Sequence, residues 1–502
     1  MPGAAGAYAI STGSIYLNQD WLETASDEQV VAVLTEELGH HLDALLNSSD
    51  TPGDEGELFA ALLLEPAGLS SSQQQSLRQL HDHGSLPMVS ASAPPLAVEL
   101  AVGTPSYQVR STPIPVASPN RSHQEFRNGS AFAALRSDGS VVSWGAYQDG
   151  GNSSGIDFDG PNNNLKVTQI FSTFFAFAAL RSDGSVVSWG DSSYGGDSSG
   201  VDFDGPNNNL KVTQIFSTSG AFAALRDDGS VVSWGSSGGN SSGVDFDGPN
   251  GNLKVTQIFS TSGAFAALRD DGSVVSWGNS RKGGNSSGID FDGPNNNLKV
   301  TQIFSTFFAF AALRSDGSVV SWGDSSYGGD SSGVDFDGPN NNLKVTQIFS
   351  TSGAFAALRD DGSVVSWGAY EDGGNSSGLD FNGPNNNLKV TQIFSNISAF
   401  ASLRSDGSVV TWGESRRGGN SSGVDFDGPN GNLKVTQIFS TSRAFAALRS
   451  DGSVVTWGDE YDSTWGESDK GGNSSGVDFD GPNDNLKVTQ IFSTWGAFAA
   501  LR

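Results

Sequence analysis

Cysteine is absent from the 502-residue sequence, and histidine occurs only five times. Without cysteine, a disulfide framework, a thiolate zinc site and a cysteine nucleophile are excluded, and the redox compartment stays open. No histidine follows His123. The chain beyond that residue therefore has no Ser-His-Asp triad and no zinc ligands other than carboxylates.

Basic residues are scarce as well. The 27 Lys and Arg face 55 Asp and Glu, which gives a net charge of -28. This charge opposes nucleic-acid phosphates and anionic lipids, so we expect no nucleic-acid partner. No run approaches the ~18 apolar residues that span a bilayer, so we expect no membrane insertion. The first residues lack the basic start and apolar run of a signal peptide, which leaves an extracellular or cell-surface location open.

A repeated peptide dominates what is present: V-T-Q-I-F-S-T, two variable residues, A-F-A-A-L-R, then D-G-S-V-V-x-W-G. Six of the seven intervals between its tryptophans are 45 residues and one is 43. Such a period indicates stacked supersecondary units, and an array of near-identical units favours recognition or scaffolding over catalysis. The tryptophans are Trp144, Trp189, Trp234, Trp277, Trp322, Trp367, Trp412 and Trp457.

One unit, residues 166–190, predicts three strands at 166–172, 176–181 and 185–189, because β-branched and aromatic residues alternate there. Asp183-Gly184 predicts a two-residue hairpin with a type I′ turn. Residues 201–203 offer a short fourth strand. Each unit thus predicts a four-stranded blade.

Radial repetition of blades protects sheet edges, so we expect a mainly β fold: a β-propeller of 7 or 8 four-stranded blades, preceded by a small α-rich N-terminal domain. A flat β-solenoid is the rival, although its rungs are usually shorter. The last V-T-Q-I-F could pair with the first D-G-S-V-V-S-W-G to close a ring, and a truncated open array is a further option.

The repeat resembles that of the family named for the regulator of chromosome condensation, with its pattern V-x-x-I, A-x-x-L and D-G-x-V-x-x-W-G. The resemblance covers residues 123–502 and implies a propeller, usually seven-bladed. Phe132, Phe177 and Phe222 stand where the family has histidine. The family's nucleotide-exchange activity rests on features outside the shared pattern and on a basic surface, so the resemblance does not imply it for this chain. The matching residues in one unit are Val167, Ile170, Ala178, Leu180, Asp183, Gly184, Val186, Trp189 and Gly190.

The units differ mainly in the loop after each Trp-Gly and in the two residues before each A-F. Tyr, Trp and Arg on loops above a rigid frame are typical of binding hot spots, so we expect a protein or glycan ligand there. Free drift of unconstrained loops is the alternative. The candidate binding residues are Tyr147, Tyr194, Arg281, Lys282, Tyr327, Tyr370, Arg416, Arg417, Tyr461 and Trp465.

A second recurring segment, Val-Asp-Phe-Asp-Gly-Pro-Asn, contains Asp202, Asp204 and Gly205 in one unit. Alternate aspartates before a glycine suit calcium, which makes these loops a possible calcium site. The alternative is that they only form turns.

Residues 1–83 are predicted to form a small helical domain, joined by a Pro/Ser-rich linker at 84–121 to the repeats at 122–502. Its helix runs from a capping box at Ser26 to about Asn47. Within it, residues 36–40 (Glu-Glu-Leu-Gly-His) resemble the H-E-x-x-H helix of zinc metallopeptidases. That resemblance implies zinc held by Glu36 and His40, Glu37 as general base, and Glu55 or Glu57 completing the shell.

Glutamate in place of the first histidine alters the charge and softness of such a site. An amphipathic helix with a solvated acidic face is the alternative. Three functions follow: a non-enzymatic scaffold that binds proteins or glycans through its loops, a secreted metallopeptidase-like protein whose propeller binds substrate, or a purely structural surface array. The first is our leading interpretation.

Overall fold

The computed structural model divides the chain into two units, Met1–Ala97 and Val98–Arg502. The structure describes residues 6–9, 14–17, 98–99, 128–160, 162–236, 238–338, 340–428, 430–459, 471–474, 476–477, 479, 486–494 and 496–502. In the first unit, β1 (Gly6–Ala9) pairs antiparallel with β2 (Ser14–Leu17). The predicted helix and the expected boundaries at 83 and 121 lie outside the described residues.

The second unit contains seven complete antiparallel sheets of three strands, here called modules. They are β6 (Val167–Ser172), β7 (Ala176–Arg181) and β8 (Val186–Gly190); β9 (Val212–Ser217), β10 (Ala221–Arg226) and β11 (Val231–Gly235); β12 (Val255–Ser260), β13 (Ala264–Arg269) and β14 (Val274–Gly278); β15 (Val300–Ser305), β16 (Ala309–Arg314) and β17 (Val319–Gly323); β18 (Val345–Ser350), β19 (Ala354–Arg359) and β20 (Val364–Gly368); β21 (Val390–Ser395), β22 (Ala399–Arg404) and β23 (Val409–Gly413); and β24 (Val435–Ser440), β25 (Ala444–Arg449) and β26 (Val454–Gly458).

Two further sheets flank these modules. Before them, β3 (Val98–Glu99) pairs with β4 (Ala131–Arg136), which pairs with β5 (Val141–Gly145). After them, β27 (Gln490–Ser493) pairs with β28 (Phe498–Leu501). The possible pairing of the last V-T-Q-I-F with the first D-G-S-V-V-S-W-G is not formed among the described residues, where β27 pairs only with β28 and β5 only with β4.

The expected fourth strand is wrong. Val201–Phe203 lies in a loop, and the carbonyl oxygens of Asp202 and Phe203 accept hydrogen bonds from the guanidinium of Arg226 instead of from a neighbouring strand. The side chains of Val201 and Phe203 pack against the core. The segment is apolar because it covers the core, and its apolar pattern resembled that of a strand.

The hairpin between the second and third strands is at the predicted place, but its type differs. Arg181 N–H donates to Ser185 O and Gly184 N–H donates to Arg181 O, so the loop has three residues. Only Gly184 has a positive φ, of 89°, whereas a type I′ turn needs two such residues. The loop is a turn followed by a left-handed glycine, which only glycine adopts without cost.

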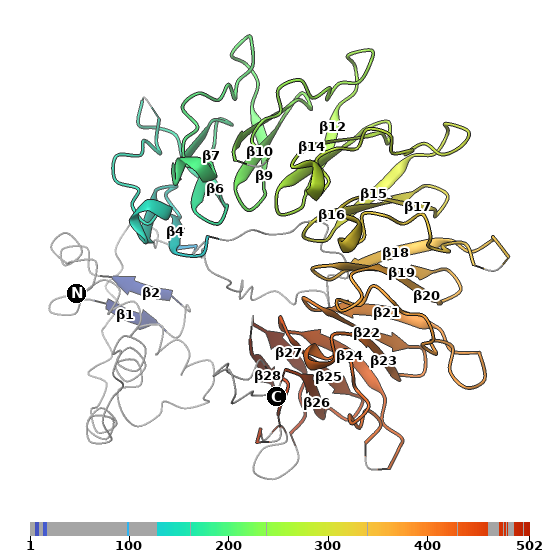
Figure 1. Ribbon diagram of the computed structural model, residues 1–502. Coiled ribbons are helices and arrows are strands. Elements are labelled where there is room, and N and C mark those ends of the chain that lie inside the picture. The colour runs from blue at the N-terminus through green and yellow to red at the C-terminus, as the bar shows by residue number, and fades with distance from the viewer. Residues whose placement is uncertain are drawn as a thin grey trace. The chain divides into compact units, whose positions relative to one another are not determined.

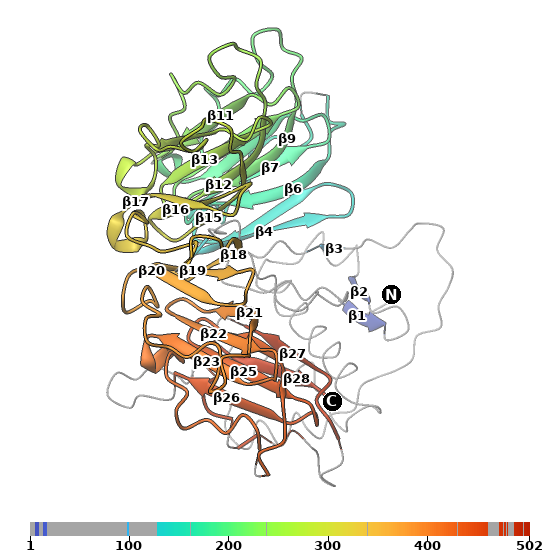
Figure 2. The ribbon, with the colours of Figure 1, turned by 90° about the vertical axis from the view of Figure 1, so that its right-hand side faces the viewer.

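The core lies between neighbouring sheets. Alternation along A-F-A-A-L-R points Ala309, Ala311 and Leu313 to one face of β16, where they meet Ile348 and Phe355 of the next module. Every module buries its two faces against its two neighbours in this way. The sheets follow one another along an arc within the second unit, and the view from the side shows them stacked in sequence (Figures 1 and 2).

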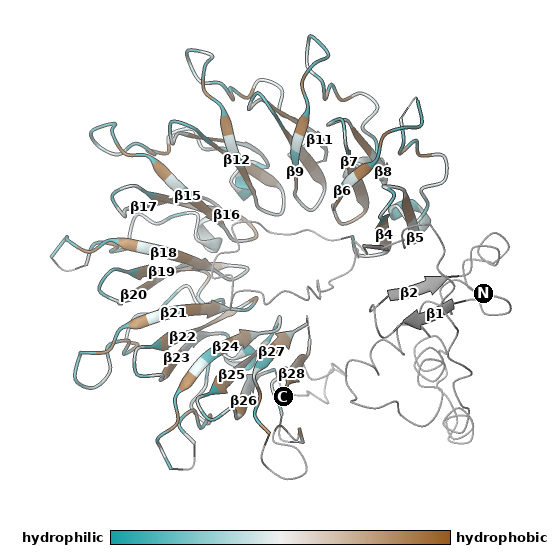
Figure 3. Ribbon diagram, turned by 180° about the vertical axis from the view of Figure 1, so that it is seen from behind, coloured by the Kyte–Doolittle hydropathy of each residue, from teal (hydrophilic) through white to brown (hydrophobic). Residues whose placement is uncertain are grey.

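The repeated small antiparallel sheets make the second unit mainly β and are consistent with a propeller. Neighbouring modules touch through their first strands, such as β15 and β18. In Figure 3 the loops that extend outward from the arc are largely hydrophilic, and the brown segments lie mainly in the strands. Among the described residues, no helix has the length and apolar character needed to cross a membrane.

Candidate functional site at the variable end of the modules

Each module has two ends that differ in sequence. The variable end carries the turn between the first and second strands, such as residues 173–175, and the loop after the third strand, such as residues 191–194. The invariant end carries the Asp-Gly turn and the Asp-Phe-Asp-Gly-Pro loop. Most sequence differences between modules lie at the variable end, because both variable segments lie there.

Backbone hydrogen bonds join the turns of the variable end from module to module. The middle residue of each turn donates its N–H to the carbonyl oxygen of the middle residue of the next, as Ser262 does to Phe307 at 2.9 Å. We call this series the turn ladder. It holds one residue of each of the seven modules and one of the flanking sheet before them in a single row: Gly129, Phe174, Ser219, Ser262, Phe307, Ser352, Ile397 and Ser442.

A buried hydroxyl or amide fixes each loop to its turn. The Thr306 hydroxyl donates to Tyr327 O at 3.0 Å and accepts the N–H of Ala309 at 3.1 Å. Where the turn begins with asparagine, the amide does the same, since Asn396 Nδ2 donates to Arg417 O at 2.6 Å. The short 3-10 helices of these loops are thereby held on the sheets: η1 (Tyr147–Asp149), η2 (Ser192–Tyr194), η3 (Ser280–Lys282), η4 (Ser325–Tyr327) and η5 (Ser415–Arg417).

Aromatic residues of turn and loop are matched in two modules. The rings of Phe175 and Tyr194 meet edge to face with centroids 4.7 Å apart, and those of Phe308 and Tyr327 do so at 4.5 Å. The ammonium of Lys282 lies 5.0 Å from the centre of the Phe308 ring, a cation–π contact. These pairs make the variable end a packed surface in both modules.

Charged residues are matched in two other modules. The guanidinium of Arg417 contacts the Glu414 carboxylate at 3.0 Å and donates to the Ser398 hydroxyl at 2.6 Å. Arg443, in the last complete turn, contacts Asp459 of the following loop at 3.4 Å. In these modules, residues that vary in the turn contact residues that vary in the loop.

The candidate binding residues thus fall into two groups. Tyr147 and Tyr370 are 73% and 76% exposed, and the side chains of Arg281 and Arg416 are also exposed. The others in the described part of the chain support the surface from beneath, being half-buried in the pairs above: Tyr194, Lys282, Tyr327 and Arg417. Tyr461 and Trp465 lie outside the described residues.

Sequence reasoning did not select Phe174 and Phe307, which are 42% and 40% exposed on the turn ladder. The signal for them was the doubled phenylalanine before A-F in these two modules, where other modules have Ser, Gly, Ile or Arg. The ladder places these rings in the same row as the polar ladder residues of neighbouring modules.

Of the two aspartates considered for calcium, only Asp202 has a structural task in its side chain. Asp202 Oδ1 accepts the N–H of Gly205 at 2.7 Å, which closes the turn, and Asp204 uses its backbone oxygen to accept two further N–H groups. Within the described ranges, no three His, Asp or Glu side chains gather as a metal site would require. The residues considered for zinc, Glu36, Glu37, His40, Glu55 and Glu57, lie outside those ranges, so that site stays a prediction.

Distant likenesses appear among solved structures. The ectodomain of the receptor kinase CR4 from Physcomitrella patens is 16% identical, with 59% of this chain and 74% of that one covered and a TM-score of 0.29. Yeast RCC1 (Prp20) bound to Kap60 is 20% identical, with 51% of this chain and 71% of that one covered and a TM-score of 0.30. The computationally designed protein Ika8 is 15% identical, with 68% of this chain and 98% of that one covered and a TM-score of 0.26.

No family model matches the sequence, and no curated protein matches it. The likenesses to solved structures are too distant to transfer a ligand or an activity to this chain.

Proposed function

We propose that the repeats form a non-enzymatic scaffold that binds a protein partner through the variable end of the modules. The supporting observation is the row of exposed groups on the turn ladder and its loops. Tyr147, Tyr370, Arg281 and Arg416 project from loops anchored by buried Thr or Asn contacts. Tyr and Arg on a rigid frame are the side chains that contribute most to protein interfaces.

A protein suits this end better than a glycan does. Its exposed groups change from module to module: tyrosine with glutamate after β20, Arg416 after β23 and Arg281 after β14. A polymer of identical sugars would meet different groups at every step, whereas a folded protein surface is itself irregular. The net charge of -28 opposes nucleic acids as partners.

Pre-organisation supports the proposal further. The loops are held by Thr-to-carbonyl hydrogen bonds and by the matched pairs, such as Arg417 with Glu414. Binding then loses little conformational freedom, which is a major cost of association. Packed pairs also argue against free drift of these loops, because a change on one side alone would lose a contact.

The test begins with photo-crosslinking from position 370 in the full chain, followed by identification of the captured protein and measurement of its affinity in purified form. We expect the triple variant Arg281→Ala, Tyr370→Ala, Arg416→Ala to bind at least about tenfold more weakly, because each hot-spot residue contributes more than 1 kcal/mol. Gln302→Ala, which changes an exposed side chain on β15 away from the variable end, is the matched control. This variant is expected to bind as the parent does.

Equal binding by the parent and the triple variant would overturn the proposal. So would weakening by Gln302→Ala to the same extent. Saturable binding of a purified glycan that the triple variant abolishes would overturn the protein assignment and make the variable end a glycan site.

A further inference from the structure

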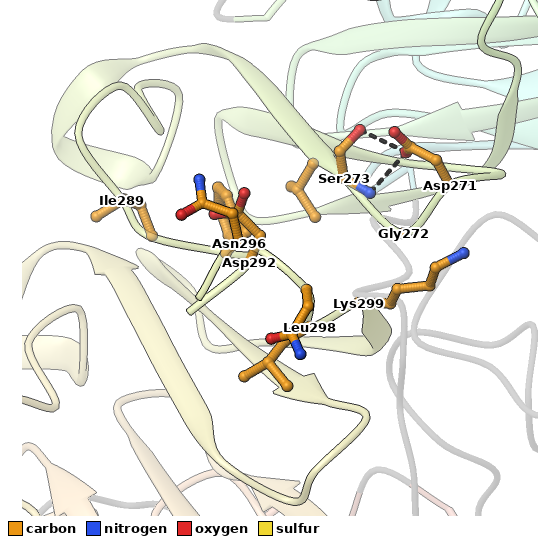
Figure 4. A pocket seen from close by; sticks show the side chains of 11 residues that line it. Asp271, Gly272, Ser273, Ile289, Asp292, Asn296, Leu298 and Lys299 are labelled. Carbon is orange, nitrogen blue, oxygen red and sulfur yellow. Dashed lines mark hydrogen bonds between the residues drawn. The ribbon is translucent and has the colours of Figure 1, made fainter. Parts of the chain in front are cut away.

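The invariant end of the modules contains a hollow that the proposed function does not use. Between β14 and the next module, the Asp-Gly turn at residues 271–274 and the loop at 289–299 enclose a hollow of 340 Å³. Small-molecule sites typically begin at about 300 Å³. Its apolar lining comes from Val274, Ile289 and Leu298, and its polar lining includes Asp292 and Asn296 (Figure 4).

Most polar groups of this hollow have a structural task, but three side chains do not. Asp271 Oδ1 accepts the N–H and the hydroxyl of Ser273, which shapes the turn. In contrast, Asp292, Asn296 and Asn297 are exposed, and their carboxylate and amide groups make no hydrogen bond to the described part of the chain. In Figure 4, Asp292 and Asn296 lie close together, and Lys299 points away from them.

Asp290 and Asp292 of the same loop differ in whether their side chains hold the loop together. Asp290 stands two positions before Asp292, and its Oδ1 closes the loop by accepting the N–H of Gly293 at 2.6 Å. Asp292 contributes only its backbone oxygen to the loop, accepting the N–H groups of Asn297 and Leu298. Any residue could supply that oxygen, so the fold alone does not account for an aspartate at this position.

The three side chains recur in the same positions. The left-handed asparagine has φ of 53° at Asn208, 53° at Asn296 and 52° at Asn341, so the side chains leave the backbone in the same direction. The same lining recurs three more times in the sequence with the same spacing: Asp159, Asn163 and Asn164; Asp204, Asn208 and Asn209; Asp337, Asn341 and Asn342. The same lining thus occurs in four loops, whereas Gly251 and Gly431 replace the first asparagine and Asn382 replaces the aspartate in three others.

We propose that this hollow, together with the three loops of the same lining, binds sugar units of a neutral polysaccharide. Carboxylate and amide groups supply acceptors and donors for sugar hydroxyls, and the apolar residues contact the faces of the sugar rings. The lining carries two aspartates against Lys299, which disfavours anionic sugars, as does the net charge of -28. Like sites in two pairs of neighbouring modules match a polymer of identical units, and their linkage converts weak single sites into firm binding.

The proposal is independent of the protein-binding function, because it concerns the opposite end of the modules. Its test is electrophoresis of the full chain through gels that contain a soluble β-glucan, an arabinoxylan or a galactomannan, with alginate as the anionic comparison. We expect at least one neutral polymer to retard the protein. The triple variant Asp204→Ala, Asp292→Ala, Asp337→Ala should lose about tenfold in affinity, since linked sites multiply one another's effect.

Thermal unfolding provides the readout that separates binding from structure. The triple variant should melt as the parent does, because the three carboxylates form no hydrogen bond within the described residues. Glu371→Ala, which removes one carboxylate from the exposed surface of the variable end, is the matched control and should be retarded as the parent is.

Several results would overturn the proposal. These are passage through every neutral gel without retardation, retardation by alginate alone, or equal retardation of the parent and the triple variant. A rise in melting temperature with calcium that the triple variant abolishes would also overturn it and would assign the hollows to a cation.

Discussion

The indole N–H of Trp322 donates a hydrogen bond of 3.0 Å to the carbonyl oxygen of Gly283, which lies in the loop between its own module and the preceding one. The tryptophan is 2% exposed and stacks on Phe310 at 5.1 Å. Equivalent bonds span 39 residues in the other complete modules, as from Trp367 to Gly328. The repeated tryptophan thus joins neighbouring modules and also fills the core.

Replacing Trp322 with phenylalanine should destabilise this boundary by about 1–3 kcal/mol, because the buried carbonyl of Gly283 loses its partner. Hydrogen exchange resolves the effect locally, and we expect faster exchange in residues 280–323 than in distant modules. Tyr147→Phe, a change at an exposed aromatic residue, is the control. Unchanged exchange in the Trp322 variant would contradict the role given to this bond.

Gly283→Ala should be more harmful than Gly288→Ala. Both glycines have left-handed backbones, with φ of 93° and 84°, so both substitutions cost roughly 1–2 kcal/mol in backbone strain. At residue 283 a methyl group would also stand 2.5 Å from the Phe310 ring, whereas at 288 nothing lies within 4 Å. Urea unfolding of the two variants measures the difference, and equal losses would show that the ring moves aside freely.

Ser321→Thr should stabilise the protein. The Ser321 hydroxyl is buried without a hydrogen-bond partner within the described part of the chain. At the same position of a later module, the Thr411 hydroxyl donates to Ser421 Oγ at 2.9 Å. A satisfied hydroxyl is worth about 0.5–1.5 kcal/mol, so the variant should melt at a higher temperature and Thr411→Ser at a lower one. A lower melting temperature for Ser321→Thr, or a higher one for Thr411→Ser, would contradict the equivalence of the two positions.

Acid should weaken the Asp-Gly-Ser turns. Burial raises the pKa of Asp316, but hydrogen bonds from the Ser318 hydroxyl and N–H and attraction to Arg314 outweigh it, so the pKa lies below its usual value. A lowered folded-state pKa means that the stabilisation is present at neutral pH and is lost as the pH falls through that value.

Asp316→Asn keeps the acceptor but cannot titrate, so its unfolding free energy should depend less steeply on pH below about pH 4. The same turns recur at Asp183, Asp228, Asp271, Asp406 and Asp451, whose pKa values are also lowered. Combining substitutions at these positions should flatten the curve further. Urea titrations from pH 3 to 6 provide the check, and parallel curves for parent and variants would contradict this account.

Strand positions could be predicted from the sequence because they depend on short-range patterns. The alternation in A-F-A-A-L-R and the Asp183-Gly184 pair place two strands and their turn correctly. The type of that turn could not be read, since it depends on whether Asp183 or only Gly184 takes a positive φ. Residues 201–203 were wrongly predicted as a strand for a different reason, because a loop segment that covers a core can have the apolar pattern of a strand.

The candidate site was predicted in part. The variable loops were recognisable from differences between modules, but the split between exposed Tyr370 and half-buried Tyr327 was not. Burial depends on the partner, and Tyr327 has Phe308 beside it, whereas Tyr370 has no such ring in the sequence of its own turn. Comparing turn and loop module by module, phenylalanine with tyrosine, would have revealed the pairing.

The turn ladder also bears on how such a gene can change in length. Each rung needs only one residue from each of two adjacent repeats, so unequal recombination that inserts a whole repeat leaves every older rung in place. Residues 171–235 recur letter for letter as residues 304–368, the imprint of such an event. Later mutations can then change the side chains of the copied repeat, while the backbone contacts that support its fold are already present.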